Sequence, residues 1–150
     1  FNAVFGGTPM SRLFTRLREE RSLCYYASSG IDEVKGLLFV QSGIDKENYD
    51  AAVEGVCAEL AAIGRGEISG EELDAARRYC SQALRLVPDD PVELMSYYMK
   101  MNITGADISP EELAALCEEV TAEEVAEIAR GAQLDAVYFL SGEDEEAEEE

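Results

Sequence analysis

One short stretch near the start of the chain constrains its fold more than any other. It begins with the glycine pair Gly6-Gly7, continues into a helix that Thr8 and Pro9 are expected to start, and enters a strand near Leu23. Three apolar side chains at helical spacing predict the buried face of that helix: Leu13, Phe14 and Leu17. Because no lysine follows the glycines at the spacing of a phosphate-binding loop, we interpret them as a helix end packed closely against a neighbour.

The same stretch contains the two candidate binding residues, Arg18 and Tyr25. Arg18 lies near the end of the expected helix and Tyr25 at the start of the strand, so the turn Arg21-Ser22 can bring both side chains to one surface. A guanidinium and a phenol side by side offer hydrogen-bond donors and a flat face to a peptide carbonyl or carboxylate. The alternative is that Arg18 pairs with an acid such as Glu19 or Glu33 and that Tyr25 is a half-buried strand residue.

The other arginines of this helix are weaker candidates. Arg12 and Arg16 are four residues apart and share one helix face. We expect that face to be solvated and close to acids, with anion binding as the lesser alternative.

The rest of the chain predicts a second strand, a series of helices and a last strand. Residues 37–42 predict a second strand, antiparallel to the first, and the apolar run Leu37-Leu-Phe-Val40 within it predicts burial on both faces. Helical spacing predicts a helix over 45–63, capped by Asp45, and further helices as far as Gly131. Residues 134–140 are expected to form the last strand. This order predicts an α+β fold, with helices packed on one face of a small, mostly antiparallel sheet.

Three capping boxes mark the starts of later helices. In each, a Ser or Thr is followed three residues later by a Glu: Ser69 with Glu72, Ser109 with Glu112, and Thr121 with Glu124. The sequence also contains several pairs of neighbouring glutamates. Most of these pairs lie in the first turn of a helix, where negative charge suits the helix dipole. They therefore need no glycosidase or metal chemistry to explain them.

The chain is strongly acidic. Its 150 residues suit a single domain, expected over residues 1–142. Of the 32 acids, seven lie in the tail 143–150, which we expect to be disordered because like charges repel; without them the net charge changes from −20 to −13. This charge argues against nucleic-acid binding and favours a cationic peptide or basic partner, although solubility alone also explains it. No apolar run is long enough to span a membrane.

The chain contains no histidine, and its four cysteines show no Cys-x-x-Cys spacing. A catalytic zinc normally needs imidazole ligands, and Ser-His-Asp or Cys-His catalysis needs a histidine too. We therefore expect no catalytic residue, no metal site, no cofactor and no enzymatic activity in this chain. The cysteines lie in apolar patterns, which favours buried free thiols, a reducing compartment and a cytoplasmic protein.

Several motifs, taken in order, resemble the C-terminal half-domain of the pitrilysin/insulinase family of zinc metallopeptidases, which includes the mitochondrial processing peptidase. The motifs are Gly6-Gly7, Ser11-Arg-Leu13-Phe14, Leu17-Arg18-Glu19, Leu23-Cys-Tyr25, Ser42-Gly43-Ile44-Asp45, Gly66-Glu-Ile-Ser69-Gly-Glu-Glu-Leu73 and Val120-Thr121-Ala-Glu-Glu-Val125. The sequence over residues 18–29 is most similar to bacterial YfmF-type members, which lack the zinc motif.

The resemblance implies a non-catalytic half of a larger duplicated protein, with a first sheet strand upstream of Phe1. It implies that an opposing half-domain or partner subunit closes a chamber with this one, and that Arg18 and Tyr25 hold an extended peptide or unfolded-protein substrate there. Zinc belongs to the parent only if the other half binds it, and the parent would then be a metalloendopeptidase. The alternatives are a scaffold subunit that binds only a protein partner, or a homodimer of the fragment.

We predict that residues 143–150 are dispensable for folding. Cutting the chain after Gly142 should leave the thermal midpoint nearly unchanged, or raise it slightly by relieving charge repulsion. Thermal melts of the two lengths test this. A midpoint lowered by several degrees would mean instead that the tail packs on a basic surface.

Overall fold

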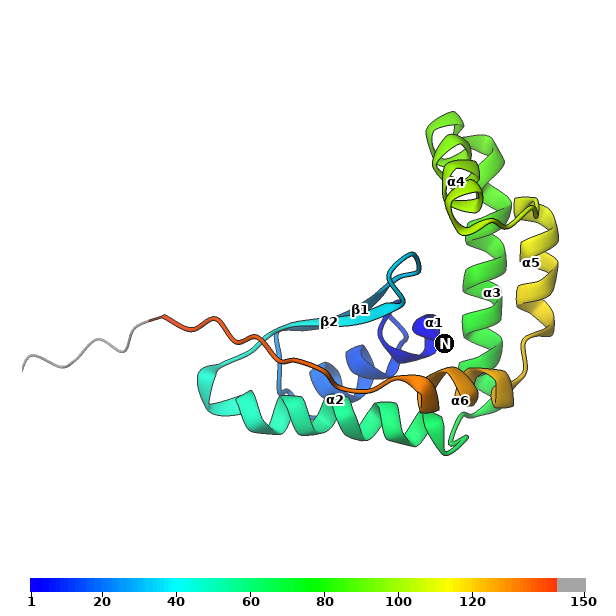
Figure 1. Cartoon of the computed structure of the whole chain (residues 1–150). Helices are drawn as coiled ribbons and strands as arrows, with labels where there is room; N and C mark the ends of the chain where they lie inside the picture. Colours follow the sequence, from blue (N-terminus) through cyan, green and yellow to red (C-terminus); the bar gives the residue numbers. More distant parts are fainter. Residues whose placement is uncertain (143–150) are drawn as a thin grey trace, which may run out of the picture.

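The computed structural model describes residues 1–142, and these form an L-shaped molecule around a two-stranded sheet (Figure 1). The predicted disorder of the tail 143–150 lies outside the described residues. The elements are α1 (Asn2–Phe5), the π-helix η1 (Leu13–Glu20), β1 (Tyr26–Asp32), β2 (Leu37–Gly43), the 3₁₀ turn η2 (Lys46–Asn48), α2 (Tyr49–Gly64), α3 (Gly70–Leu86), the 3₁₀ turn η3 (Val87–Asp89), α4 (Pro91–Thr104), α5 (Pro110–Glu119) and α6 (Ala122–Gly131). The α+β class and the helices over one sheet face are confirmed.

The sheet is an antiparallel hairpin, as predicted, with Tyr26 opposite Gly43 and Asp32 opposite Leu37. Burial of the second strand on both faces is wrong, because Leu37 and Phe39 remain 56% and 48% exposed. Helices cover one face only, and the outward side chains of β2 face solvent. The Phe39 ring instead lies against the backbone of Gly30 across the hairpin, where a Cβ would come within 2.3 Å of the ring.

The predicted last strand over 134–140 does not form within the described residues. After α6 the chain runs as an extended segment past α2 (Figure 1), and within residues 1–142 β1 and β2 pair only with each other. The ring of Phe139 packs on Tyr49 of α2, with centroids 4.7 Å apart. A strand needs a neighbour for its backbone hydrogen bonds, and in the described part of the chain no strand pairs with this segment.

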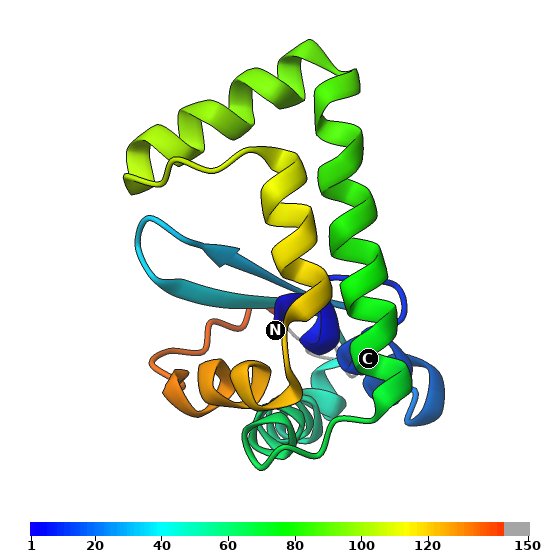
Figure 2. The ribbon, with the colours of Figure 1, turned by 90° about the vertical axis from the view of Figure 1, so that its right-hand side faces the viewer.

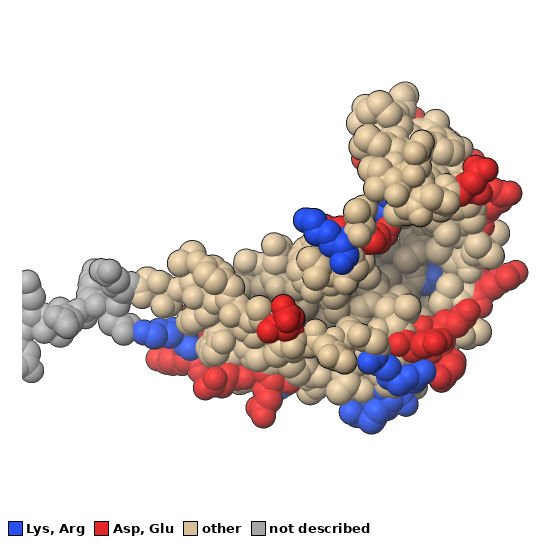
Figure 3. All heavy atoms as spheres, viewed as in Figure 1, with Lys and Arg blue, Asp and Glu red and all other residues tan. Residues whose placement is uncertain are grey.

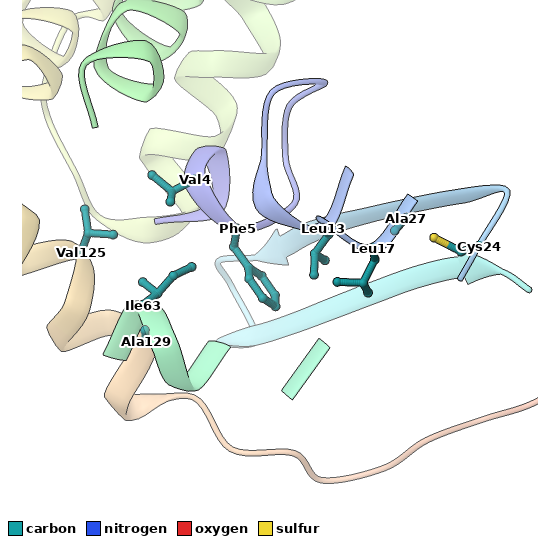
Figure 4. Close-up of a cluster of buried hydrophobic side chains, with 9 residues drawn as sticks. All are labelled: Val4, Phe5, Leu13, Leu17, Cys24, Ala27, Ile63, Val125 and Ala129. Atoms are coloured by element: carbon teal, nitrogen blue, oxygen red, sulfur yellow. The ribbon is translucent and has the colours of Figure 1, made fainter. Parts of the chain in front are cut away.

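A single apolar cluster holds α1, η1, the sheet, α2 and α6 together (Figure 4). Its buried members are Val4, Phe5, Leu13, Leu17, Cys24, Ala27, Ile63, Val125 and Ala129. Gly6 ends α1 directly beneath β1, and the Ser29 N–H donates to the Gly6 carbonyl over 2.9 Å. A Cβ on Gly6 would lie 2.5 Å from Ser29 Oγ, so the close approach predicted for this glycine is confirmed. The expected helix start at Thr8 and Pro9 is wrong: these residues form a turn, and η1 begins at Leu13.

The second arm of the L is built from α3 and α5, which lie side by side, with α4 folded across their far end (Figure 2). All three predicted capping boxes form with both reciprocal hydrogen bonds. Asp90 caps α4 by accepting hydrogen bonds from the Val92 and Glu93 N–H groups. None of the helices within residues 1–142 combines the length and apolar character needed to cross a bilayer.

Arg12 ties the two arms together from inside the molecule. Its side chain is only 2% exposed, and it binds both carboxylate oxygens of Glu72, at 2.7 and 3.0 Å. It also donates to the Glu67 carbonyl in the turn between α2 and α3. Glu59 of α2 lies 3.7 Å from Arg12 and 2.9 Å from Arg16. The predicted solvated face is therefore wrong for Arg12, because folding of the elbow encloses it.

Arg12→Met should lower the free energy of unfolding by about 3–5 kcal/mol, since it leaves a partly buried carboxylate without its partner. Arg16→Met is the matched control. Arg16 is 38% exposed, and its loss should cost about 1 kcal/mol or less. Urea titration of both variants measures the difference. If both variants lose the same free energy of unfolding, the buried Arg12 stabilises the fold no more than the exposed Arg16 does.

Glu72 should make stability depend on acid pH. Burial raises the pKa of Glu72, but hydrogen bonds from Arg12 and from Ser69 outweigh it and lower the pKa to about 2. The stabilisation is therefore complete above about pH 4.5, the ordinary pKa, and is lost as the pH falls toward 2. We expect it to be about 1–2 kcal/mol after allowance for solvent screening.

The difference in unfolding free energy between the wild type and Glu72→Gln, measured from pH 7 to pH 2, tests this dependence. It should be constant at neutral pH and shrink below pH 4.5. Taking the difference removes the contributions of the other acids. A difference that grows on acidification would contradict the assignment.

Candidate functional site

Arg18 and Tyr25 line the same surface depression, at the junction of η1 and the sheet. The turn between them depends on Ser22, which takes a left-handed φ of 52°. Beyond the turn, the Tyr25 N–H donates to the Gly43 carbonyl over 2.8 Å and so joins the chain to β2. The depression has a volume of about 330 Å³ and is lined by Arg18, Ser22, Leu23, Cys24, Tyr25 and Asp45. Both predicted site residues thus line one depression, on either side of the turn at Arg21-Ser22.

The Arg18 guanidinium is exposed and rests on an aromatic ring. Its central carbon lies 4.6 Å from the centroid of Phe14, within cation–π range. Phe14, expected in the buried face of the helix, is half-buried beneath this arginine. Within residues 1–142 Arg18 makes no ion pair, and Glu33, the alternative partner, binds Lys100 at 2.7 Å. The donors of Arg18 are therefore available to a ligand.

The Tyr25 side chain is 67% exposed, and its hydroxyl donates to Asp45 Oδ1 over 2.8 Å. This hydrogen bond to a carboxylate raises the pKa of Tyr25. Asp45 was expected to cap a helix, but its side chain makes no cap hydrogen bond. The sequence analysis missed it as a site residue. The signal in the sequence was the position of Asp45 just past the predicted second strand. The last residue of β2, Gly43, pairs with Tyr26, which adjoins Tyr25 in the chain.

The remaining surface is rich in carboxylates. Figure 3 shows acidic side chains along the outer edge of α2 and on the α5 side of the molecule. The acidic residues of the chain outnumber the basic ones, 32 to 12, which gives the net charge of −20. A cationic ligand would be attracted to this surface.

The residues of this chain do not fit a catalytic zinc. The chain supplies no imidazole ligand. Cys24 is buried in the core beneath the sheet, and Cys57, Cys80 and Cys117 are half-buried on separate helices. The donors for such a centre are therefore missing from this chain.

Comparison with known proteins defines the class. The family described as Peptidase M16 inactive domain matches residues 1–80. The chain is 33% identical over 142 residues, 95% of its length, to the "Probable inactive metalloprotease YmfF" of Bacillus subtilis. Among solved structures, a conserved protein from Enterococcus faecalis V583 is similar at 33% identity over 86% of this chain, with a TM-score of 0.79. A peptidase M16 inactive domain from Pseudomonas fluorescens shares the fold at 20% identity over 89% of the chain, with a TM-score of 0.76.

The family match and the fold define a domain of metallopeptidase type. The chain belongs to the peptidase M16 family and corresponds to its inactive domain. It spans 33% of the length of the Bacillus relative, and 31% and 32% of the Enterococcus and Pseudomonas structures. The predicted family and the predicted fold are therefore confirmed, and the binding roles of Arg18 and Tyr25 stay predictions.

Proposed function

We propose that this domain closes one side of a peptide-binding chamber and contacts an extended peptide through Arg18 and Tyr25. The observation that carries the proposal is the shared depression, in which the Arg18 guanidinium is exposed and makes no ion pair within residues 1–142. A guanidinium suits a peptide carbonyl, because it offers charged donors in a fixed planar arrangement. The acidic surface supports a peptide that carries basic residues.

In this proposal an opposing half-domain or partner subunit supplies the other wall of the chamber. The chain spans about a third of its relatives, which leaves room for such a half in the parent protein. Any zinc would belong to that half, and any hydrolysis would occur there.

The second candidate is a scaffold domain that binds only a protein partner. It is favoured by α4, which carries four large apolar side chains at helical spacing, each about 60% exposed: Val92 64%, Met95 64%, Met99 59% and Ile103 61%. The two candidate functions predict different effects of replacing Arg18, because Arg18 contributes to peptide binding only in the first.

Arg18→Ala should weaken peptide binding by the parent protein by roughly tenfold to a hundredfold, since a hydrogen bond from a charged group contributes about 1.5–3 kcal/mol. Its thermal midpoint should hardly change, because the arginine makes no ion pair within residues 1–142. Fluorescence anisotropy with a labelled basic peptide, beside a thermal melt, makes both measurements.

The matched control is Arg78→Ala, which removes the same charge from another exposed helix position. It should bind the peptide as the wild type does. Normal binding by a folded Arg18→Ala variant would reject the peptide-contact role and favour the scaffold function.

A further inference from the structure

The hydrogen bond between Tyr25 and Asp45 decides what the depression can recognise. A phenol has a single O–H, and the Tyr25 hydroxyl gives it to Asp45 Oδ1 over 2.8 Å. Toward a ligand, the Tyr25 oxygen is left with lone pairs and no hydrogen. Arg18, by contrast, has donors only. Arg18 and Tyr25 therefore present opposite hydrogen-bonding characters to a ligand in this depression.

We infer that Asp45 is a positioning residue that holds the Tyr25 hydroxyl as an acceptor, so that the depression takes a peptide N–H at Tyr25 and a peptide C=O at Arg18. This inference rests on the proposed peptide-binding function. In an extended chain, the N–H and C=O of one residue point to the same side, as in the hydrogen-bonded pairs of an antiparallel sheet. One donor and one acceptor on the protein match that edge.

The alternative ligand, a free C-terminal carboxylate, fits less well. A carboxylate accepts hydrogen bonds and would need donors from both side chains. The Tyr25 oxygen offers none while Asp45 holds its hydrogen, and the Asp45 charge itself would repel the carboxylate. The site therefore suits an internal segment of an extended peptide.

Asp45 is exposed, and within residues 1–142 its carboxylate accepts a hydrogen bond from Tyr25. Because it makes no cap to η2, its removal should leave the helix start largely intact. This makes Asp45→Ala a usable variant. Asp107→Ala, at an exposed loop position, controls for the lost charge, and Tyr138→Phe controls for loss of an exposed phenol.

The binding test uses the parent protein and two probes. One is a peptide of alternating Val and Lys with both ends blocked, and the other is its analogue with ester oxygens in place of the Val N–H groups. The wild type should prefer the amide probe by about fivefold to tenfold, in keeping with about 1 kcal/mol for one hydrogen bond. Tyr25→Phe and Asp45→Ala should lose much of this preference. Because both probes are measured on the wild type and on each variant, effects of the ester that do not involve Tyr25 cancel in the comparison.

A second measurement needs no peptide. The ultraviolet titration of Tyr25, taken as the difference between proteins with and without Tyr25→Phe, should move to lower pH when Asp45 is replaced by Ala. The hydrogen bond that raises the pKa of Tyr25 is then lost. An unchanged titration would overturn the positioning role whatever the peptide results show.

The outcomes separate the inference from the function on which it rests. If Arg18→Ala abolishes binding but the amide preference persists in Tyr25→Phe and Asp45→Ala, the peptide function stands and the inference fails. If the wild type binds neither probe, the proposed function fails and the assigned ligand fails with it. Loss of the preference in both variants, with a shifted titration and normal controls, supports both.

Discussion

Burial of the Arg12 guanidinium at the elbow is the constraint on which the arrangement of the two arms depends. A buried arginine needs partners for its charge and its donors, and here Glu72 and the Glu67 carbonyl accept from Nε and Nη2. Nη1 makes no hydrogen bond within the described residues and lies 3.7 Å from the Glu59 carboxylate. Glu72 also completes the capping box that starts α3. The same carboxylate thus starts the helix of one arm and binds η1 of the other. Movement of α3 would separate the Glu72 carboxylate from the buried Arg12 guanidinium. The angle between the two arms is therefore coupled to this ion pair and to the start of α3.

The candidate site is positioned by the same framework. Leu13 and Leu17, fully buried beneath the sheet, fix η1 against the core, so Arg18 and Phe14 are presented outside it. The left-handed Ser22 then returns the chain to the sheet, where Tyr25 meets Asp45 beyond the end of β2. A rigid core and a sharp turn together place one donor side chain and one acceptor side chain on a surface that is otherwise acidic.

An open sheet and an exposed helix face indicate surfaces suited to further contacts. Helices cover only one face of the β1–β2 hairpin, and Tyr26 and Phe39 remain about half exposed on it. The α4 face with Met95 and Met99 is also uncovered within the described residues. Both features suit a domain that works inside a larger assembly. The length of its relatives, about three times that of this chain, agrees with such a setting.

Local chemistry determined much of this protein from the sequence alone. Capping boxes such as Ser69 with Glu72 depend on residues three apart, and the antiparallel hairpin depends on a short turn, so both could be predicted. The absence of histidine is read directly from the composition. Tertiary structure decided the rest. Burial of Arg12 requires Glu72, 60 residues away. Residues 134–140 form no strand because neither β1 nor β2, the strands among residues 1–142, pairs with them. The Tyr25 hydroxyl has no hydrogen left for a ligand because Asp45, 20 residues later, folds back to accept it. Contacts between residues so distant in the chain leave no periodic signal in the sequence.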